Sequence, residues 1–189
     1  RDIVPGFAGV MVKSNRMAEP FRELGLDKIA VTGEMRFEQP INQIHIDAAV
    51  RMRSHFPGRP VLTFASAVKD EDALFIAAMQ ALKSRMPDAL IVYVPRKPEH
   101  FNRAAELIQA AGLSVARRSV VLDTKFEFEM PLTCNVLLGD SLGEMHFYLA
   151  LADQVVVGGG FAPQGSHNII EPLSQGKPTI VGPIHGPLI

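Results

Sequence analysis

The sequence predicts an α/β protein in which a mostly parallel sheet carries helices on both faces. From residue 61 onwards, short apolar runs typical of buried strands alternate with longer amphipathic stretches of helical period. One run, the valines at 155–157, passes directly into the glycines at 158–160, as strands of such sheets pass into ligand-binding loops. Strands that alternate with helices are joined by right-handed crossovers, so these observations together indicate a Rossmann-like layout.

The composition describes a globular chain without a strongly charged partner. Its 189 residues are 47% hydrophobic and 21% charged, which suits one domain or slightly more than one. Nineteen basic and twenty acidic residues give a net charge of -1, which argues against nucleic acid or an anionic membrane surface as a partner. The single cysteine, Cys134, excludes an internal disulfide and fits a reducing compartment.

The ends of the sequence indicate a piece of a longer protein. The first residues, RDIVPGFAGVMVKS, begin in mid-pattern without a start methionine and do not resemble a signal peptide. The chain stops at Ile189, soon after a predicted strand. No apolar run reaches the roughly 18 residues that are needed to span a bilayer. We therefore expect a soluble fragment without a membrane segment.

The first forty residues are expected to form a strand, a helix and a second strand. Residues 7–13 resemble a short strand, Ser14 can cap the helix that follows, and Gly25 ends that helix. The second strand is expected at residues 28–32. The segment TGEMRFEQP, residues 32–40, then looks like a crossing between two lobes rather than a core element.

The rest of the chain carries the alternating pattern. Strands are expected at residues 61–67, 90–94, 114–118, 135–138 and 155–157, and a further strand is expected at the end of the stretch 154–183. Helices are expected at residues 41–55, 70–85, 98–111 and 142–152 and after the glycine-rich loop. The predicted buried faces are Ile44, Ala48 and Met52, then Leu74, Ala78 and Leu82, then Ala104, Leu107, Ile108 and Ala111. The segment TKFEFEMPLT, residues 124–133, alternates apolar with charged residues and is expected to be an exposed edge strand with solvated acidic residues.

Polar residues follow the first two strands of this series. Ligands of a parallel sheet bind beyond the carboxyl ends of its strands, so these loops are candidate sites. Ser66 and Lys69 follow the first strand, and Arg96 and Lys97 follow the second. Arg96 and Lys97 could hold a phosphate or a carboxylate, or they could form a solvated basic loop.

The third loop is the GDSLGE turn, residues 139–144, which contains Asp140, Ser141, Gly143 and Glu144. Its two carboxylates could bind a metal or act as acid and base, but the same turn can cap the following helix, and we favour capping. We expect no metal site, because the remaining histidines show no metal-ligand spacing. These histidines are His45, His55, His100, His146 and His185.

The glycine-rich loop is the strongest candidate for a binding site. The glycines at 158–160 allow the backbone to approach a ligand, and a helix is expected to begin near His167 or Asn168. The first amides of that helix lack internal partners and favour a phosphate. Asn168 and Glu171 share a helical face, and a carboxylate suits the hydroxyls of a sugar. The loop therefore predicts a nucleotide with a sugar attached, although such turns also occur without a ligand.

Two other classes of function are disfavoured. Ser66, His167 and a carboxylate could form a hydrolase triad, but the sequence has no G-x-S-x-G elbow. A dinucleotide-binding oxidoreductase needs G-x-G-x-x-G at the first strand-to-helix turn, where FASAVKDE contains no glycine. We therefore expect no cofactor.

Four ordered segments carry a resemblance to a known family. They are VTGEMRF (31–37), VYVPRKPEHF (92–101), VLLGDSLGEM (136–145) and GGGFAPQGSHNIIEPLSQGKPTIVGP (158–183). Together they resemble the 3-deoxy-D-manno-octulosonic acid (Kdo) transferases of lipopolysaccharide assembly. The resemblance implies one lobe of a two-lobed GT-B-type glycosyltransferase. Residues 1–40 are then the tail of the amino-terminal lobe with the crossing, and residues 41–189 are the nucleotide-sugar-binding lobe, truncated at its end.

The resemblance also implies a reaction. It is transfer of Kdo from CMP-Kdo to a lipid A precursor, with inversion and without a required metal, at the cytoplasmic side of the bacterial inner membrane. The family's catalytic base is a glutamate of the amino-terminal lobe, so this chain alone is expected to be inactive.

Arg96, the Gly143 and Glu144 pair and the SHNxxEP segment match donor-site motifs of the family. The chemistry of the residues assigns Arg96 to the donor's anionic groups, the amides of residues 166–168 to its phosphate and Glu171 to a sugar hydroxyl. The candidate donor-binding residues are Arg96, Lys97, Ser141, Gly143, Glu144, Gly159, Gly160, Ser166, His167, Asn168 and Glu171. No residue of the chain is expected to be catalytic or to bind a metal.

One turn departs from the family's pattern. The family usually has a turn rich in serine, threonine, histidine and glutamate after the first strand of this lobe, where this sequence reads ASAVKDED, residues 65–72. Two alternatives therefore stay open. One is a related transferase that uses another nucleotide sugar, and the other is a non-catalytic domain of the same fold that binds a nucleotide or a partner.

Overall fold

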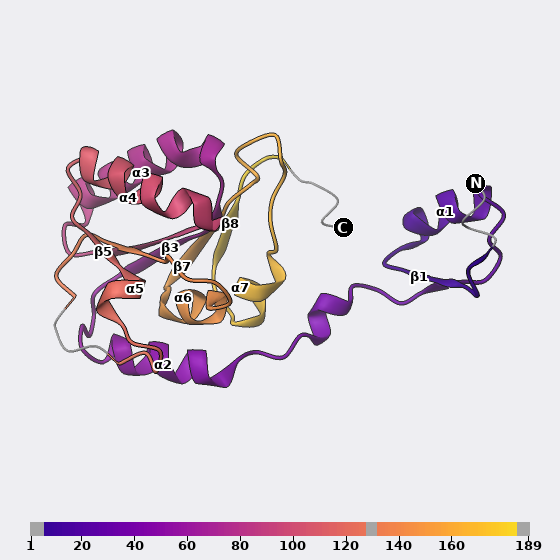
Figure 1. Cartoon of the computed structure of the whole chain (residues 1–189), viewed down its shortest axis with the longest axis horizontal. Helices are drawn as coiled ribbons and strands as arrows, with labels where there is room; N and C mark the ends of the chain where they lie inside the picture. Colours follow the sequence, from indigo (N-terminus) through magenta and orange to yellow (C-terminus); the bar gives the residue numbers. More distant parts are fainter. Residues whose placement is uncertain (1–5, 128–131, 185–189) are drawn as a thin grey trace. The chain divides into compact units, whose positions relative to one another are not determined.

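The computed structural model of the protein describes residues 6–127 and 132–184 (Figure 1). Internal contacts divide the chain after Pro40 into two compact units. The first unit contains β1 (Val10–Val12), α1 (Asn15–Glu23), β2 (Ile29–Val31) and the 3-10 turn η2 (Met35–Glu38). β1 and β2 form a parallel pair, which makes this unit the strand, helix and strand that the sequence predicts.

Local chemistry accounts for the helix of the first unit. The Ser14 hydroxyl accepts a hydrogen bond from the Met17 amide at 3.4 Å, so the predicted N-cap is confirmed. Gly25 has a φ of +86°, the left-handed conformation that commonly follows a helix end. In the crossing segment, the Glu34 carboxylate pairs with Lys13 and with Arg36, which strongly lowers the pKa of Glu34.

The second unit contains a six-stranded parallel sheet with the strand order β5-β6-β4-β3-β7-β8. Its strands are β3 (Val61–Ala67), β4 (Leu90–Pro95), β5 (Val115–Arg117), β6 (Val136–Leu138), β7 (Gln154–Val157) and β8 (Thr179–Val181). The central strands are buried on both faces, which explains why they read as continuous apolar runs. The predicted Rossmann-like parallel sheet is confirmed.

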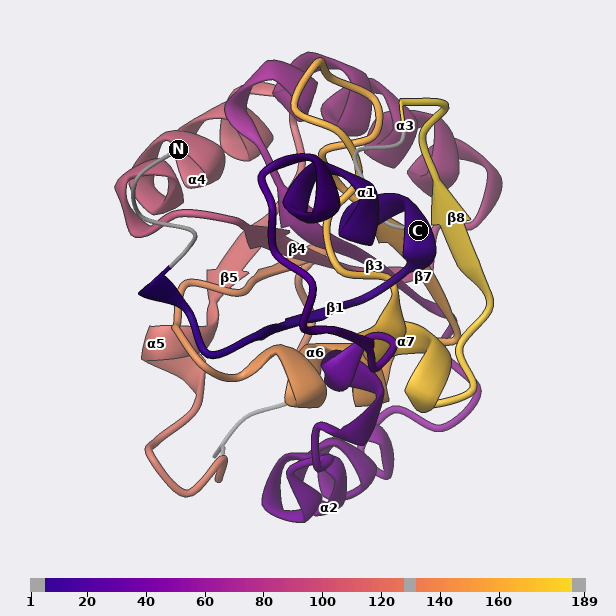
Figure 2. The same cartoon turned by 90° about the vertical axis from the view of Figure 1, so that its right-hand side faces the viewer.

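Helices cover both faces of this sheet (Figures 1 and 2). They are α2 (Gln43–Arg53), α3 (Asp72–Arg85), α4 (Phe101–Ala110), α5 (Arg118–Val121), α6 (Met145–Leu151) and α7 (Ile170–Ser174), with 3-10 turns η3 (Lys69–Glu71) and η4 (Pro98–His100). α3 and α4 pack on one face, and α2, α5, α6 and α7 pack on the other. This division follows from right-handed crossovers, because the chain moves along the sheet in one direction through α3 and α4 and in the other through α5, α6 and α7.

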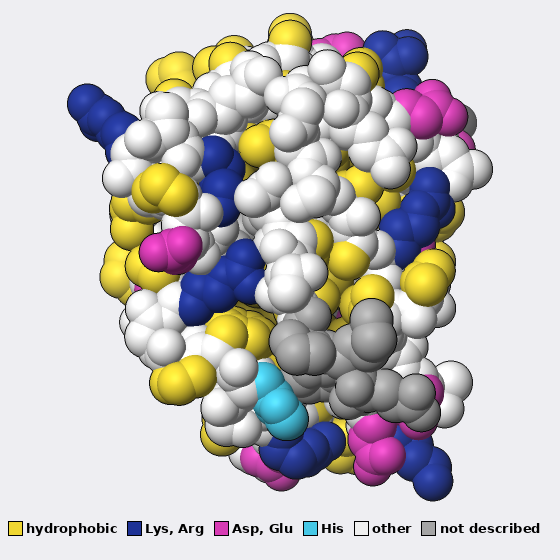
Figure 3. All heavy atoms as spheres, turned by 90° about the vertical axis from the view of Figure 1, so that its left-hand side faces the viewer, with side chains coloured by type: hydrophobic (Ala, Val, Ile, Leu, Met, Phe, Trp, Pro, Cys, Tyr) yellow, Lys and Arg dark blue, Asp and Glu magenta, His cyan; other side chains and the backbone are white. Residues whose placement is uncertain are grey.

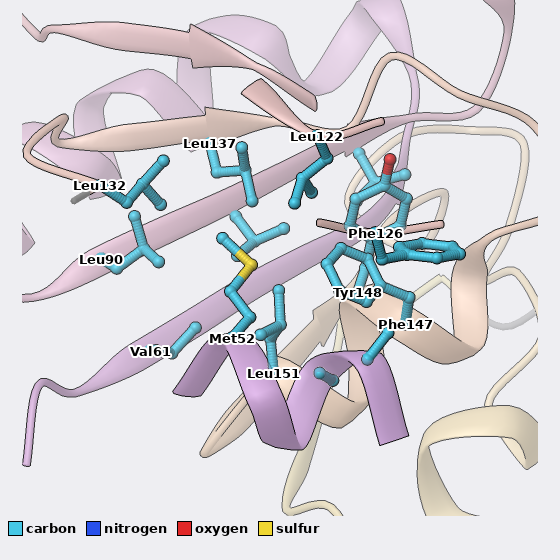
Figure 4. Packing of buried hydrophobic residues seen from close by; sticks show 14 of the residues in the cluster. Met52, Val61, Leu90, Leu122, Phe126, Leu132, Leu137, Phe147, Tyr148 and Leu151 are labelled. Atoms are coloured by element: carbon cyan, nitrogen blue, oxygen red, sulfur yellow. The ribbon is translucent and has the colours of Figure 1, made fainter. Parts of the chain in front are cut away.

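The larger core cluster lies between the sheet and the helices α2 and α6. Figure 4 shows Met52 of α2 and Leu151 of α6 beside Val61, Leu90 and Leu137 of the sheet. Each of these side chains is at most 2% exposed. Full burial of such a side chain contributes roughly 1.5–3 kcal/mol relative to exposure, so this layer supports the strands that end at the site.

Two predicted helix faces need correction. On α2, Ala48 and Met52 are buried as predicted, but Ile44 is 69% exposed because it lies in the first turn, outside the layer over the sheet. On α3, Leu82 packs on the core as predicted, but Phe75 and Met79 are buried in place of Leu74, which is 51% exposed, and Ala78, which is exposed. The Phe75 ring packs against Phe64 of β3, and this contact sets the rotation of the helix.

The predicted edge strand at residues 124–133 is also wrong in its described part. Residues 124–127 form a turn, and residues 128–131 lie outside the described residues. Phe126 adopts a φ of +60° and is buried rather than exposed. Its ring stacks on Phe147 and lies under the Arg118 guanidinium, so a local aromatic contact replaces a strand. Glu127 is exposed, as predicted.

Charged side chains are mixed on the part of the surface in Figure 3. Lys and Arg side chains are interspersed there with Asp, Glu and apolar side chains.

Near the amino end of β3, the Arg59 guanidinium donates to the carbonyl oxygens of Asp88, Leu132 and Cys134. Arg59 therefore joins loops at this edge of the sheet, opposite the carboxyl ends of the strands.

Candidate functional site

The candidate site lies at the carboxyl ends of β3 and β7. These strands are neighbours, and the chain leaves β3 toward β4 on one side whereas β7 lies on the other side. Such a reversal of strand order is the topological switch point at which α/β sheets bind ligands. Ser66, near the end of β3, has a φ of +56°, and the pairing with β4 shifts register between Phe64 and Ala67. Backbone strain of this kind concentrates at functional sites.

The glycine-rich loop after β7 is closely packed against the chain itself. A Cβ on Gly158 would lie 2.6 Å from the Ser66 carbonyl oxygen, and a Cβ on Gly159 would lie 2.3 Å from that of Gly165. A Cβ on Gly160 would lie 2.2 Å from the Ser166 hydroxyl oxygen. The sequence predicts that these glycines let the backbone approach a ligand. In the structure they let two stretches of backbone approach each other.

Glu71 is the residue of this site that sequence reasoning missed. Its side chain is 1% exposed, and its carboxylate accepts hydrogen bonds from the amides of Gly159 at 2.7 Å, Phe161 at 3.0 Å and Val68 at 3.2 Å. It thus joins the loop after β3 to the loop after β7. The one signal in the sequence was a carboxylate directly after a buried strand, in the turn that departs from the family's pattern.

His167 and Arg96 lie beside these two loops. The His167 ring lies against Gly159, 3.0 Å from where a Cβ would be, and within the described residues its buried Nε2 has no hydrogen-bond partner. Burial is the main cause that lowers the pKa of His167, nearby Arg96 lowers it further, and Glu71 opposes both. Arg96 is exposed, and its amide donates to the Ala67 carbonyl oxygen at 2.8 Å. His167 therefore contacts Gly159, and Arg96 is near enough to lower the pKa of His167.

The helix after the loop begins later than predicted. α7 starts at Ile170, whose amide donates to the Asn168 side chain at 3.0 Å. The Ser166 amide donates to the Ile184 carbonyl oxygen and the His167 amide to that of Gly158, both at 3.0 Å. These two amides are occupied, so the prediction that they bind a phosphate was wrong. The physical reason is that the loop forms backbone hydrogen bonds of its own before the helix begins.

Glu171 remains a candidate for contact with a sugar. It lies in the first turn of the helix, whereas Asn168 precedes the helix, so the two residues do not share a helical face. The Glu171 side chain is half-buried. Within residues 6–127 and 132–184, its carboxylate has no hydrogen-bond or ion-pair partner, which leaves both oxygens able to accept.

The GDSLGE turn is hydrogen-bonded to α5, and the Ser141 hydroxyl of the turn also lies 2.5 Å from the Tyr148 hydroxyl of α6. Asp140 accepts hydrogen bonds from the Ser119 amide at 2.8 Å and the Ser119 hydroxyl at 2.6 Å, so it caps α5. Glu144 accepts from the Arg118 guanidinium at 2.6 Å and the Ser141 hydroxyl at 2.5 Å, and it makes no capping bond to α6. The prediction that this turn caps the following helix was therefore wrong.

Several predicted residues lie apart from the switch point. Ser141, Gly143 and Glu144 follow β6, which is separated from β3 by β4, although all these strands end at the same edge. Gly143 has a φ of +78° with open space beside it. Lys97 is 64% exposed, with its Nζ 3.8 Å from Glu99, as in a solvated basic loop.

Two kinds of feature are absent from the described residues, a cluster of metal ligands and a membrane-spanning helix. Among residues 6–127 and 132–184, no group of three or more His, Cys, Asp or Glu side chains is arranged to hold a metal ion. In the same part of the chain, no helix combines the length and the apolar character needed to cross a membrane.

The fold is that of one lobe of a two-lobed GT-B-type glycosyltransferase. The chain is similar to the C-terminal CMP-Kdo binding domain of WaaA from Acinetobacter baumannii, with a TM-score of 0.67 and 30% sequence identity over 76% of this chain and 73% of that one. No family model matches the chain.

Curated relatives agree with this class. The chain is 38% identical to the 3-deoxy-D-manno-octulosonic acid transferase of Bordetella pertussis over 186 residues, which are 97% of this chain and 42% of the relative. It is 29% identical to that of Rickettsia bellii (strain RML369-C) over 96% of this chain and 42% of the relative. The chain belongs to the Kdo transferase family, and it spans about two fifths of the length of these relatives.

Proposed function

We propose that the chain is the donor-binding lobe of a Kdo transferase that uses CMP-Kdo. The observation that carries this proposal is the structural similarity to a CMP-Kdo binding domain at 30% identity. The grouping of Arg96, Gly159 and His167 at the topological switch point supports it, because ligands of parallel sheets bind there. A guanidinium beside a half-buried imidazole suits the phosphate and the carboxylate of such a donor.

The remaining roles follow the chemistry of each candidate. We assign the free carboxylate of Glu171 to hydroxyl groups of the donor, because a carboxylate accepts the hydrogen bonds that hydroxyls donate. We assign Gly143 and the Ser141 and Glu144 pair to the periphery of the donor, beyond the end of β6. Ser166, Asn168 and Gly160 shape the loop.

In the full-length enzyme we propose that a lipid A precursor is the acceptor. The catalytic base and the surface that binds the acceptor then belong to the part of the protein outside this chain, and the reaction takes place at the cytoplasmic side of the bacterial inner membrane. An inverting transferase needs a base for the acceptor hydroxyl and stabilisation of the departing nucleotide phosphate. This lobe supplies the second of these requirements.

The test is calorimetric titration of the 189-residue chain with CMP, with UMP and NAD as controls. We expect CMP to bind, and we expect the double variant Arg96→Ala, Glu171→Ala to weaken binding by at least about tenfold, as for loss of charge-assisted hydrogen bonds. A matched control is Arg51→Ala, Glu106→Ala, which removes the same charges from exposed positions on α2 and α4.

Each outcome has a distinct meaning. CMP binding that only the Arg96 and Glu171 variant loses supports the proposed donor site. Binding of UMP in place of CMP points to a related transferase that uses another nucleotide sugar. If no nucleotide binds, the proposal for this lobe fails, and a non-catalytic domain of the same fold becomes the better description.

A further inference from the structure

Glu71 lies where the loops of the switch point converge. Its Oε1 accepts from the amides of Gly159 and Phe161, and its Oε2 accepts from the amide of Val68. Backbone amides that converge in this way form an anion-binding nest, and glycine-rich loops use such nests to bind phosphates. In this protein the anion in the nest is the carboxylate of the protein itself.

Among the described residues, hydrogen bonds from backbone amides stabilise the Glu71 carboxylate, and no ion pair does so. The side chain is 1% exposed, and among residues 6–127 and 132–184 it forms no ion pair with a Lys, Arg or His. A buried carboxylate without such hydrogen bonds would be strongly unfavourable, so the two loops and Glu71 stabilise one another. Gly158 also lies here, where a Cβ would come within 2.7 Å of Oε2.

Because Glu71 occupies the nest, these amides cannot also hold a phosphate. The donor's anionic groups then need basic side chains beside the loops, and Arg96 and His167 are two such side chains. Each is connected by its backbone to a loop that Glu71 holds, since the Arg96 amide donates to Ala67 and the His167 amide donates to Gly158. Displacement of one loop would therefore displace one of the two side chains.

We propose that Glu71 is a positioning residue for the donor. Its carboxylate fills the amide nest as an internal anion, fixes the loops after β3 and β7, and thereby presents Arg96 and His167 to the donor's anionic groups. This inference rests on the proposed donor site. The turn at residues 65–72, where the sequence departs from the family's pattern, then supplies the carboxylate that holds the two loops.

The first test compares CMP binding to the 189-residue chain and to its Glu71→Ala and Asp70→Ala variants. Asp70 is the matched control, because this neighbouring carboxylate also reaches the loop after β7, through the Gln164 side chain at 2.8 Å, but it is exposed and lies outside the amide nest. We expect Glu71→Ala to weaken CMP binding by roughly tenfold or more. We expect Asp70→Ala to bind CMP within about twofold of the wild type.

Chemical rescue distinguishes a lost anion from general damage. Formate is a carboxylate small enough for the space that Glu71→Ala leaves. We expect excess sodium formate to restore CMP affinity to this variant, whereas the same concentration of sodium chloride does not. The wild type and Asp70→Ala should not respond to formate. If formate does not restore CMP affinity to a folded Glu71→Ala variant, the Glu71 carboxylate does not act as the internal anion of the nest.

A second variant covers the case in which Glu71→Ala does not fold. Glu71→Gln keeps the size of the side chain but replaces one acceptor oxygen by an NH2 group, which faces an N–H donor of the nest. We expect altered amide resonances of Gly159, Phe161 or Val68 in nitrogen–proton spectra without nucleotide, and weaker CMP binding.

The outcomes separate this inference from the proposed function. If the wild type does not bind CMP, the proposed function fails, and the amide spectra still test the nest. If the wild type binds CMP and Glu71→Gln binds it equally tightly with unchanged amide resonances, the positioning role is overturned.

Discussion

At the residue scale, two carboxylates of the second unit are held by different partners. Backbone amides balance Glu71, whereas Glu144 pairs with the guanidinium of Arg118, which is 5% exposed and also donates to the Leu122 carbonyl oxygen. Removing one member of a buried pair leaves the other charge uncompensated. The same kind of side chain is therefore used for two structural tasks at one edge of the sheet.

His167 is expected to make the stability of the chain depend on pH. Burial holds its folded pKa below the ordinary value of 6.5, so the unfolded state binds more protons as the pH falls below that value. The contribution of His167 to the free energy of unfolding is complete above the ordinary pKa and is lost as the pH falls toward the folded pKa.

The measurement is urea unfolding at about pH 7.5 and about pH 5.5 for the wild type and His167→Asn. We expect the wild type to lose more stability than the variant between these two conditions. Burial also lowers the pKa of His45, but that contribution is common to both proteins and cancels in the comparison. Equal losses would contradict the assignment of this pH dependence to His167.

At the element scale, α3 illustrates how a helix face is chosen. Its sequence contains apolar residues on several sides, so Leu74 and Phe75 are equally good candidates for burial. The structure buries Phe75 because its ring contacts Phe64 of β3 and Phe161 of the glycine-rich loop. The rotation of α3 is thus coupled to the loop that forms the site.

Substitutions on this helix should differ sharply in their effect on stability. Met79 is 0% exposed, so we expect Met79→Ala to lower the free energy of unfolding by roughly 2–5 kcal/mol, from lost burial and a residual cavity. Leu74 is 51% exposed, so Leu74→Ala should cost less than about 1 kcal/mol. Urea unfolding measures both. If Leu74→Ala lowered the free energy of unfolding more than Met79→Ala does, the buried face predicted from the sequence would be supported instead.

At the scale of the whole molecule, the second unit carries a core of its own. Among the described residues, the hydrophobic clusters on the two faces of its sheet are made of residues from Ala48 onwards. The division after Pro40 falls in the segment for which the sequence predicts a crossing between lobes. The assignment of residues 1–40 to the tail of another lobe stays a proposal.

Residues 41–189 are therefore expected to fold without the first forty residues. Their thermal unfolding midpoint should lie within a few degrees of that of the 189-residue chain, which corresponds to less than about 1 kcal/mol for a domain of this size. Calorimetry of both proteins measures this difference. A cooperative loss of structure on truncation would show that the first unit stabilises the second.

The sequence by itself determined the six strands of the parallel sheet, the longer helices between them and the loops in which to look for a ligand. These features depend on local signals, namely β-branched runs such as the valines at 155–157 and residues such as Ser14 that cap a helix. It also supplied Arg96 and His167 as candidates. Only the tertiary structure decided which side of α3 is buried, that the amides of residues 166 and 167 are occupied, and that Glu71 fills the nest. The physical reason is that two of the three amide partners of Glu71 lie 88 and 90 residues away along the chain, so its burial is favourable only after β3 and β7 have paired.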